Sequence, residues 1–148
     1  MELESPMTTV MPAKHERNYL MQICVQDAHT DFMGHVNNAQ FLHWAQEAAL
    51  TYWRSNAPPD ALENMAWVAV EHVIRYHRPS FTGDDIRLEV GLSKVRGSCA
   101  YFSIHFLREK EALATIESTW CCVCTARHRP LRIPAYLIAS FADRGLAI

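Results

Sequence analysis

The feature that most constrains the fold is an apolar stretch from Ala39 to Arg54 that contains neither glycine nor proline. Its polar side chains recur every three or four positions, which places them in one stripe of a helix: Gln40, His43, Glu47, Thr51 and Arg54. The remaining apolar arc is wide for a surface helix, so we expect this helix to be largely buried. Asn37 or Asn38 is a good N-cap. The helix ends by Asn56-Ala-Pro-Pro, because neither proline can donate a backbone hydrogen bond.

Alternation of apolar and polar side chains predicts strands on both sides of this helix. One strand precedes it, over residues 19–25, and four follow it, over residues 67–77, 86–93, 100–106 and 112–125. A short helix is predicted from about Ala135. A sheet must bury one face, and the helix of residues 38–54 is the one large apolar partner in the sequence. We therefore predict an α+β fold, in which a curved antiparallel sheet wraps around one long central helix.

Length and composition limit the domain organisation and the classes of function. A chain of 148 residues suggests one domain. Residues 1–16 contain two prolines and no periodicity, so we interpret them as a flexible arm before a single domain over residues 17–148. The net charge of −2 argues against nucleic-acid binding. The sequence has no apolar run of membrane-spanning length and no signal-peptide core, which indicates no membrane partner and a cytoplasmic protein.

The cysteines are interpreted as free thiols. Their number, five, is odd, and Cys121, Cys122 and Cys124 lie too close together for the usual zinc-ligand spacing. Free cysteine behaves as a small apolar residue. We therefore expect buried, reduced thiols and no metal site.

The densest group of chemically capable residues lies in the loop that enters the long helix, from His29 to Asn38. The N-terminus of a helix presents unpaired N–H groups that can stabilise an oxyanion. The carboxylate of Asp31 lies a few residues upstream, where it can act as a base or a nucleophile towards an acyl carbonyl. Residue type alone also fits plain structural roles, with Asp31 in a turn and the asparagines as caps.

The stretch Asp31-Phe-Met-Gly-His-Val-Asn-Asn-Ala-Gln-Phe-Leu resembles the signature of the 4-hydroxybenzoyl-CoA thioesterase-like branch of the hotdog superfamily. Its His-Val-Asn-Asn core also resembles plant acyl-carrier-protein thioesterases. Weaker matches follow at Arg75-Tyr-His-Arg-Pro, at Gly83-Asp84 and at Arg132-Ile-Pro, so that the resemblance spans about residues 18–138. It implies a hotdog fold and an acyl-CoA thioesterase, which needs no cofactor because coenzyme A is part of the substrate.

The resemblance also implies roles for single residues. Asp31 matches the catalytic carboxylate, and the backbone N–H of Asn38 matches the group that polarises the thioester carbonyl. His35 matches a histidine that is catalytic in the plant branch and absent from several bacterial members, so here it is either catalytic or orients the loop. Gln46 stands where many relatives have a carboxylate, and the neighbouring Glu47 is expected to be a solvated surface charge.

Further residues are expected to contact the substrate rather than to react with it. Four of these are Gly34, Asn37, Phe41 and Gln46, with a place in the core as the alternative for Phe41. The basic residues Arg129 and Arg132 are candidates for contacts with the phosphates of coenzyme A, although solvated charges at a strand end are the alternative.

Assembly and three competing functions remain open from the sequence. Related folds pair their sheets edge to edge, so a homodimer or homotetramer is expected, and an exposed edge strand gives an independent reason for pairing. The alternatives to an acyl-CoA thioesterase are an acyl-carrier-protein thioesterase, a hydratase or dehydratase, and a non-catalytic module that binds acyl-CoA.

Overall fold

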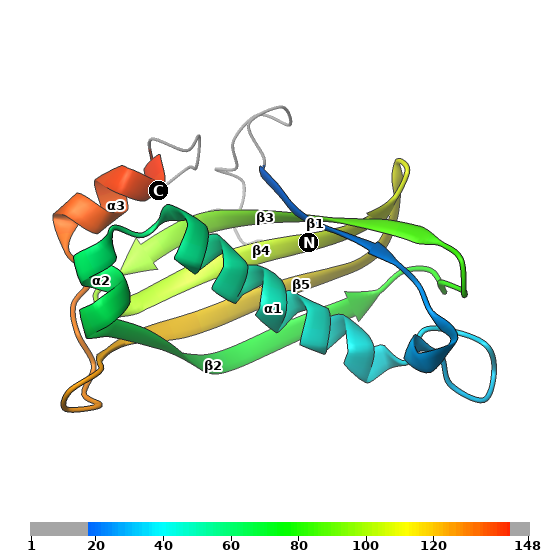
Figure 1. Ribbon diagram of the computed structural model, residues 1–148, viewed down its shortest axis with the longest axis horizontal. Helices are drawn as coiled ribbons and strands as arrows, with labels where there is room; N and C mark the ends of the chain where they lie inside the picture. The colour runs from blue at the N-terminus through cyan, green and yellow to red at the C-terminus, as the bar shows by residue number, and fades with distance from the viewer. Residues whose placement is uncertain (1–17, 143–148) are drawn as a thin grey trace.

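The computed structural model describes residues 18–142, which form one five-stranded sheet with a long helix across one face (Figure 1). In chain order the elements are β1 (Asn18–Cys24), a 3-10 turn (Asp27–His29), α1 (Asn38–Asn56), α2 (Pro59–Asn64), β2 (Met65–Tyr76), β3 (Asp85–Arg96), β4 (Cys99–Arg108), β5 (Glu111–Cys124) and α3 (Ala135–Ala142). This order confirms the predicted strand, helix and four further strands. The predicted arm over residues 1–16 lies outside the described residues.

The strands are arranged in the order β1-β3-β4-β5-β2, and every neighbouring pair is antiparallel. The strand β2 does not pair with its successor β3. It pairs with β5, so that β2 forms the edge of the sheet opposite β1. The segment that contains α1 and α2 therefore carries the chain from one edge of the sheet to the other. Within residues 18–142, β1 and β2 pair on one side only, so each is an edge strand.

The core lies between α1 and the inner face of the sheet. Alternate residues of β4 are buried on that face: Ala100, Phe102, Ile104 and Phe106. The ring of Phe41 on α1 lies edge to face against Phe106 at 5.1 Å, and the ring of Tyr52 meets Phe102 at 5.9 Å. Seven residues of α1 are buried, which confirms the expected central helix.

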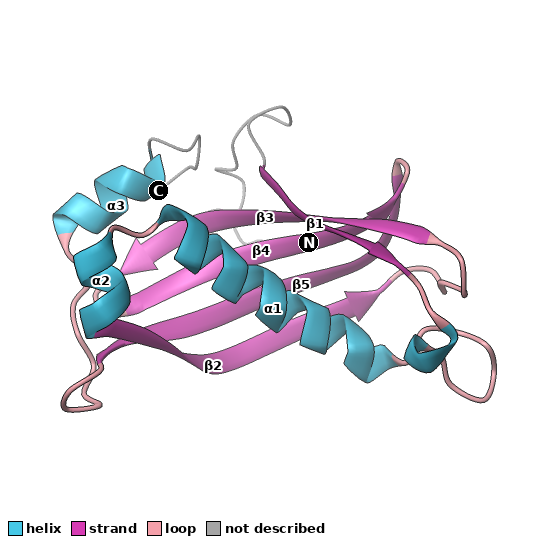
Figure 2. Cartoon of the chain, viewed as in Figure 1, coloured by secondary structure: helices cyan, strands magenta, loops and turns pink. Residues whose placement is uncertain are grey.

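Asn37 fixes the start of α1. Its side-chain oxygen accepts the N–H of Ala39 at 2.9 Å, so Asn37 is the cap and Asn38 is the first helical residue. The helix ends at Asn56, just before the Pro58-Pro59 pair that the sequence indicated as its limit. The sequence did not predict α2, which begins with Pro59 in its first turn and lies with α3 beyond the C-terminal end of α1 (Figure 2).

The cysteines correct one expectation. Cys122 is fully buried, but Cys24 is exposed and the other three are half-buried, so the expectation of buried thiols holds for Cys122 alone. Burial raises the pKa of the Cys122 thiol to about 11, with a smaller contribution from Cys121. Among the described residues, no helix is long and apolar enough to cross a membrane.

Candidate active site

The loop that carries Asp31 is a tight turn closed by hydrogen bonds. The N–H of Gly34 donates to the carbonyl of Asp31 at 3.0 Å, and the N–H of Asp31 donates to the carbonyl of His35 at 2.8 Å. Gly34 has φ of +80°, a left-handed conformation that residues with a Cβ adopt rarely. The glycine is therefore needed for the chain to reverse between Asp31 and His35.

The Asp31 carboxylate has a defined local partner. Its Oδ1 accepts the N–H of Met33 at 2.9 Å, which fixes the side chain against its own turn. Among the described residues, no protein group bonds the second oxygen, Oδ2. The two residues at the tip of the turn project into solvent, since Phe32 is 97% exposed and Met33 is 61% exposed.

His29 packs beneath this loop rather than into an open site. Its ring meets the ring of Trp44 edge to face at 5.1 Å, and its Nδ1 accepts the N–H of Gln26 at 2.9 Å. Its backbone carbonyl accepts the N–H of Asn37 at 2.9 Å. His29 thus connects the loop to α1 in two ways: its ring contacts Trp44, and its carbonyl accepts the N–H of the cap residue Asn37.

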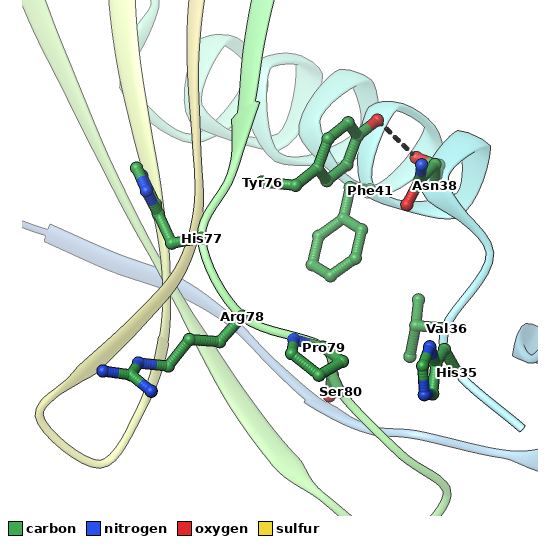
Figure 3. A pocket seen from close by; sticks show the side chains of 9 residues that line it. All are labelled: His35, Val36, Asn38, Phe41, Tyr76, His77, Arg78, Pro79 and Ser80. Carbon is green, nitrogen blue, oxygen red and sulfur yellow. Dashed lines mark hydrogen bonds between the residues drawn. The ribbon is translucent and has the colours of Figure 1, made fainter.

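A cleft of about 250 Å³ opens at the N-terminal end of α1 (Figure 3). One wall consists of residues from the loop and the first turn of the helix, and these are His35, Val36, Asn38 and Phe41. The other wall is the run of residues 76–80 at the end of β2. The structure therefore brings together three of the predicted site residues, His35, Asn38 and Phe41, with a segment far away in the sequence.

Tyr76 joins the two walls of the cleft. Its hydroxyl donates to the backbone carbonyl of Asn38 at 2.9 Å, and its ring lies 5.8 Å from that of Phe41 (Figure 3). Burial raises the pKa of the Tyr76 phenol, so this donor stays protonated at neutral pH. Asn38 is the first helical residue, and its own N–H has no acceptor within the helix. The first turn of α1 is thus held in place, and the N–H groups of Ala39 and Gln40 bond Asn37, which leaves that of Asn38 without an acceptor in the cap.

His35 faces the same cleft from the loop. Its ring contacts the ring of Phe81 edge to face at 5.1 Å, and the two residues form an isolated antiparallel bridge. The next residue, Val36, is buried and donates its N–H to the carbonyl of Ser80 at 2.8 Å. The segment from His35 to Val36 is therefore bonded directly to the far wall.

The other predicted site residues lie outside the cleft wall. Asp31 and Gly34 form the adjacent turn, and Asn37 caps the helix with its side chain. Gln46 is half-buried two turns further along α1. Its neighbour Glu47 is a surface charge, as expected from the sequence. Its Oε2 lies 3.7 Å from Nε2 of His43.

Arg129 and Arg132 lie at the opposite end of the molecule from the cleft. They follow β5, whose last residue Cys124 pairs with Met65 at the start of β2. Tyr76 is at the other end of β2, roughly 35 Å away by the rise of a strand. Within one chain these arginines therefore do not meet the cleft.

The sequence pointed to the second wall of the cleft without giving it a role. The run from Arg75 to Pro79 was part of the family resemblance, but neither Tyr76 nor Ser80 was singled out. Ser80 is buried and belongs to a turn held by Asp84. The available sequence signal was the position of Ser80 between the Arg78-Pro79 pair and the Gly83-Asp84 turn.

Comparison with known proteins places the chain in a family. Residues 25–141 match the model of the thioesterase-like superfamily. The long-chain acyl-CoA thioesterase FadM of Escherichia coli (strain K12) is 29% identical over 108 residues, which cover 70% of this chain and 80% of FadM.

Two solved structures agree with the fold. YbaW, a probable thioesterase from Escherichia coli, has a TM-score of 0.71 and 25% identity over 85% of this chain and 97% of its own. A thioesterase from Thermus thermophilus, complexed with coenzyme A and Zn, has a TM-score of 0.75 and 20% identity over 86% and 93% of the two chains. The curved sheet around a buried helix is thus the hotdog fold, and the chain belongs to the thioesterase-like superfamily as a thioester hydrolase.

Proposed function

We propose that this protein is an acyl-CoA thioesterase, which hydrolyses its substrate to a free acid and coenzyme A. The observation that carries the proposal is the cleft at the N-terminus of α1, where Asn38 lies beside the loop of Asp31. The substrate class is supported by FadM, a long-chain acyl-CoA thioesterase, and by a neighbour of the same fold that binds coenzyme A.

In the proposed mechanism, the thioester carbonyl oxygen accepts the N–H of Asn38. This N–H lies at the positive end of the helix, where it stabilises the charge that develops on the oxygen. Asp31 acts as the base: Oδ2 takes a proton from a water molecule whose oxygen attacks the carbonyl carbon. The C–S bond then breaks, and the leaving thiolate takes a proton back from Asp31. Direct attack by the carboxylate, followed by hydrolysis of the anhydride, is the alternative with the same products.

His35 is assigned an orienting role. Its ring is held against Phe81 and its carbonyl accepts the N–H of Asp31, so its contacts fix the loop. A catalytic role would require the imidazole to exchange a proton with the substrate. His35→Gln should therefore reduce turnover less than Asp31→Asn does.

The central test is a thiol-release assay over a panel of acyl- and aroyl-CoA esters with the parent chain and Asp31→Asn. We expect the variant to fold and to lose at least 100-fold in kcat, a typical contribution of a positioned base. Asp85→Asn, at an exposed aspartate at the start of β3, is the matched control and should retain parent activity. An active Asp31→Asn variant would refute the proposed role of Asp31.

The carrier and the catalytic competence have their own tests. One acyl group presented on coenzyme A and on an acyl-carrier protein distinguishes the two thioesterase activities by their kcat/KM values. Tight binding of acyl-CoA without release of thiol from any ester would instead favour a binding module.

We also propose that two copies pair through the edge strand β2. This 12-residue strand exposes Val68, Val70 and Val73, at 53%, 62% and 46%. An open apolar edge of this length needs cover, and a two-fold axis covers it with the same strand of a second copy. Val70→Lys should shift the sedimentation coefficient towards that of a monomer, whereas Leu62→Lys on α2 should not. An unchanged oligomer in Val70→Lys would exclude this edge.

Such pairing would give Arg129 and Arg132 access to the substrate. Antiparallel pairing about the middle of β2 sets the Met65 end of one copy beside the Tyr76 end of the other, next to the cleft. Replacing both arginines with glutamine should then raise KM for an acyl-CoA and leave the KM of a short acyl-pantetheine unchanged. Equal effects on both esters would remove the phosphate assignment.

A further inference from the structure

The turn at the end of the second cleft wall, residues 79–81, is hydrogen-bonded to the carboxylate of Asp84, which does not itself line the cleft. Asp84 Oδ2 accepts the hydroxyl of Ser80 at 3.0 Å and the N–H of Phe81 at 2.9 Å. The same oxygen accepts Nη1 of Arg108 at 2.7 Å. Three donors on one oxygen leave the turn of residues 79–81 little freedom to shift.

Arg108 spans the space between this turn and the end of the sheet. Its Nη1 also approaches the carbonyl of Pro79 at 3.4 Å, while Nε and Nη2 both bond Glu111 Oε1, at 3.1 and 2.6 Å. A guanidinium is a rigid planar fork, so carboxylates at both ends fix its orientation. The side chains of Arg108 and Asp84 are only 26% and 23% exposed, which reduces screening by solvent.

The same turn is bonded to the loop that enters α1. The carbonyl of Ser80 accepts the N–H of Val36, and Phe81 bridges His35. The carbonyl of His35 in turn accepts the N–H of Asp31. The segment between the proposed base and the proposed oxyanion donor is thus attached to the turn that Asp84 and Arg108 hold.

We propose that Asp84 and Arg108 are positioning residues for thioester hydrolysis, which hold the 79–81 turn and through it the register of residues 35–38. The proposal rests on the proposed function, because it assigns the placement of Asn38 relative to Asp31 to this pair. Catalytic groups must be placed to within a fraction of an ångström, and a misplacement of about 1 Å can cost about 100-fold in rate. An ion pair that only stabilised the fold would change the melting temperature and leave kcat of the folded enzyme unchanged. Rate and stability should therefore respond differently when the pair is broken.

The decisive variant is Arg108→Met, which keeps the length of the side chain and removes the fork. We expect kcat to fall at least tenfold, KM to change less than threefold, and the melting temperature to change by only a few degrees. Arg108→Lys retains a cation for Asp84 and should recover a large part of kcat. Lys110→Met, an exposed cation in the adjacent β4–β5 turn, is the matched control and should keep parent kinetics. Asp84→Asn serves as the second variant if Arg108→Met does not fold.

Hydrogen exchange of the Val36 amide measures how firmly the loop is attached to the turn, because the Val36 N–H donates to the carbonyl of Ser80. We expect faster exchange at Val36 in Arg108→Met, and protection restored in Arg108→Lys. Parent kcat in a folded Arg108→Met, or a kcat loss with unchanged Val36 exchange, would overturn the proposal. Absence of thioesterase activity in the parent would refute the proposed function, while unchanged Val36 exchange would still refute the coupling of the turn to the loop.

Discussion

Gly34→Ala tests whether the shape of the Asp31 turn controls turnover. An added Cβ at position 34 would meet no atom within 4 Å, so the cost of this substitution is conformational rather than steric. Holding an L-residue at φ of +80° costs roughly 1–2 kcal/mol. In a chain of this size, 1 kcal/mol lowers Tm by roughly 2–4 °C. We therefore expect Tm to fall by roughly 2–8 °C in thermal unfolding followed by circular dichroism.

Gly97→Ala is a matched control for this substitution. Gly97 lies in the β3–β4 turn with φ of +62°, and a Cβ there also meets nothing within 4 Å. Both variants should lose a similar free energy of unfolding. Only Gly34→Ala should also lower kcat for acyl-CoA, because only that turn carries Asp31. Equal kcat in the two variants would refute the link between the turn and the chemistry. A loss above about 4 kcal/mol in Gly34→Ala would show that the cost is not conformational.

Three further predictions concern the core, the acid stability and the thiols. Phe106→Ala should lower the free energy of unfolding by about 3–5 kcal/mol in urea titration, because Phe106 is fully buried against Phe41. Burial alone would raise the pKa of Asp84, but bonds from the Phe81 N–H, Arg108 and Ser80 outweigh it and lower the pKa. This stabilisation is complete above the ordinary aspartate pKa and is lost as pH falls through the lowered value. Asp84→Asn should therefore flatten the pH dependence of stability below about pH 4 in acid titration. Cys122 should react with a thiol reagent only on unfolding, whereas the exposed Cys24 should react at once in the native protein.

The sequence predicted the long helix and the strands well, because both follow from local periodicity. The uninterrupted apolar stretch from Ala39 marked the one element large enough to fill the sheet, and the asparagine pair marked its start. Choosing Asn37 over Asn38 required the structure, since either side chain can cap a helix.

The pairing of β2 with β5 could not be predicted from local pattern. The alternation in residues 67–77 shows that a strand exists and which residues share a face, but not which strand lies beside it. That choice depends on the path of α1 across the sheet, which is a property of the whole fold. The second wall of the cleft was missed for the same reason, because Tyr76 reaches Asn38 only through this path.

For the basic residues after β5, the sequence indicated a suitable chemistry but not the position. Arg129 and Arg132 are chemically suited to phosphate, but residue type says nothing about distance from the site. In one chain the length of β2 separates them from the cleft. Their predicted role now depends on a second copy of the chain.

The strand order also has a consequence for how the protein folds. The turns that join β3, β4 and β5 are short, so these strands can pair early through local contacts. By contrast, β1 must find β3, and β2 must find β5, across long stretches of chain, and such non-local pairings form slowly. One wall of the cleft, residues 76–80, continues from the edge strand β2, and the loop of the other wall is bonded to it through Val36 and Ser80. We therefore expect this wall to form late and to fray early, so that turnover is lost in partial unfolding before the helix signal falls.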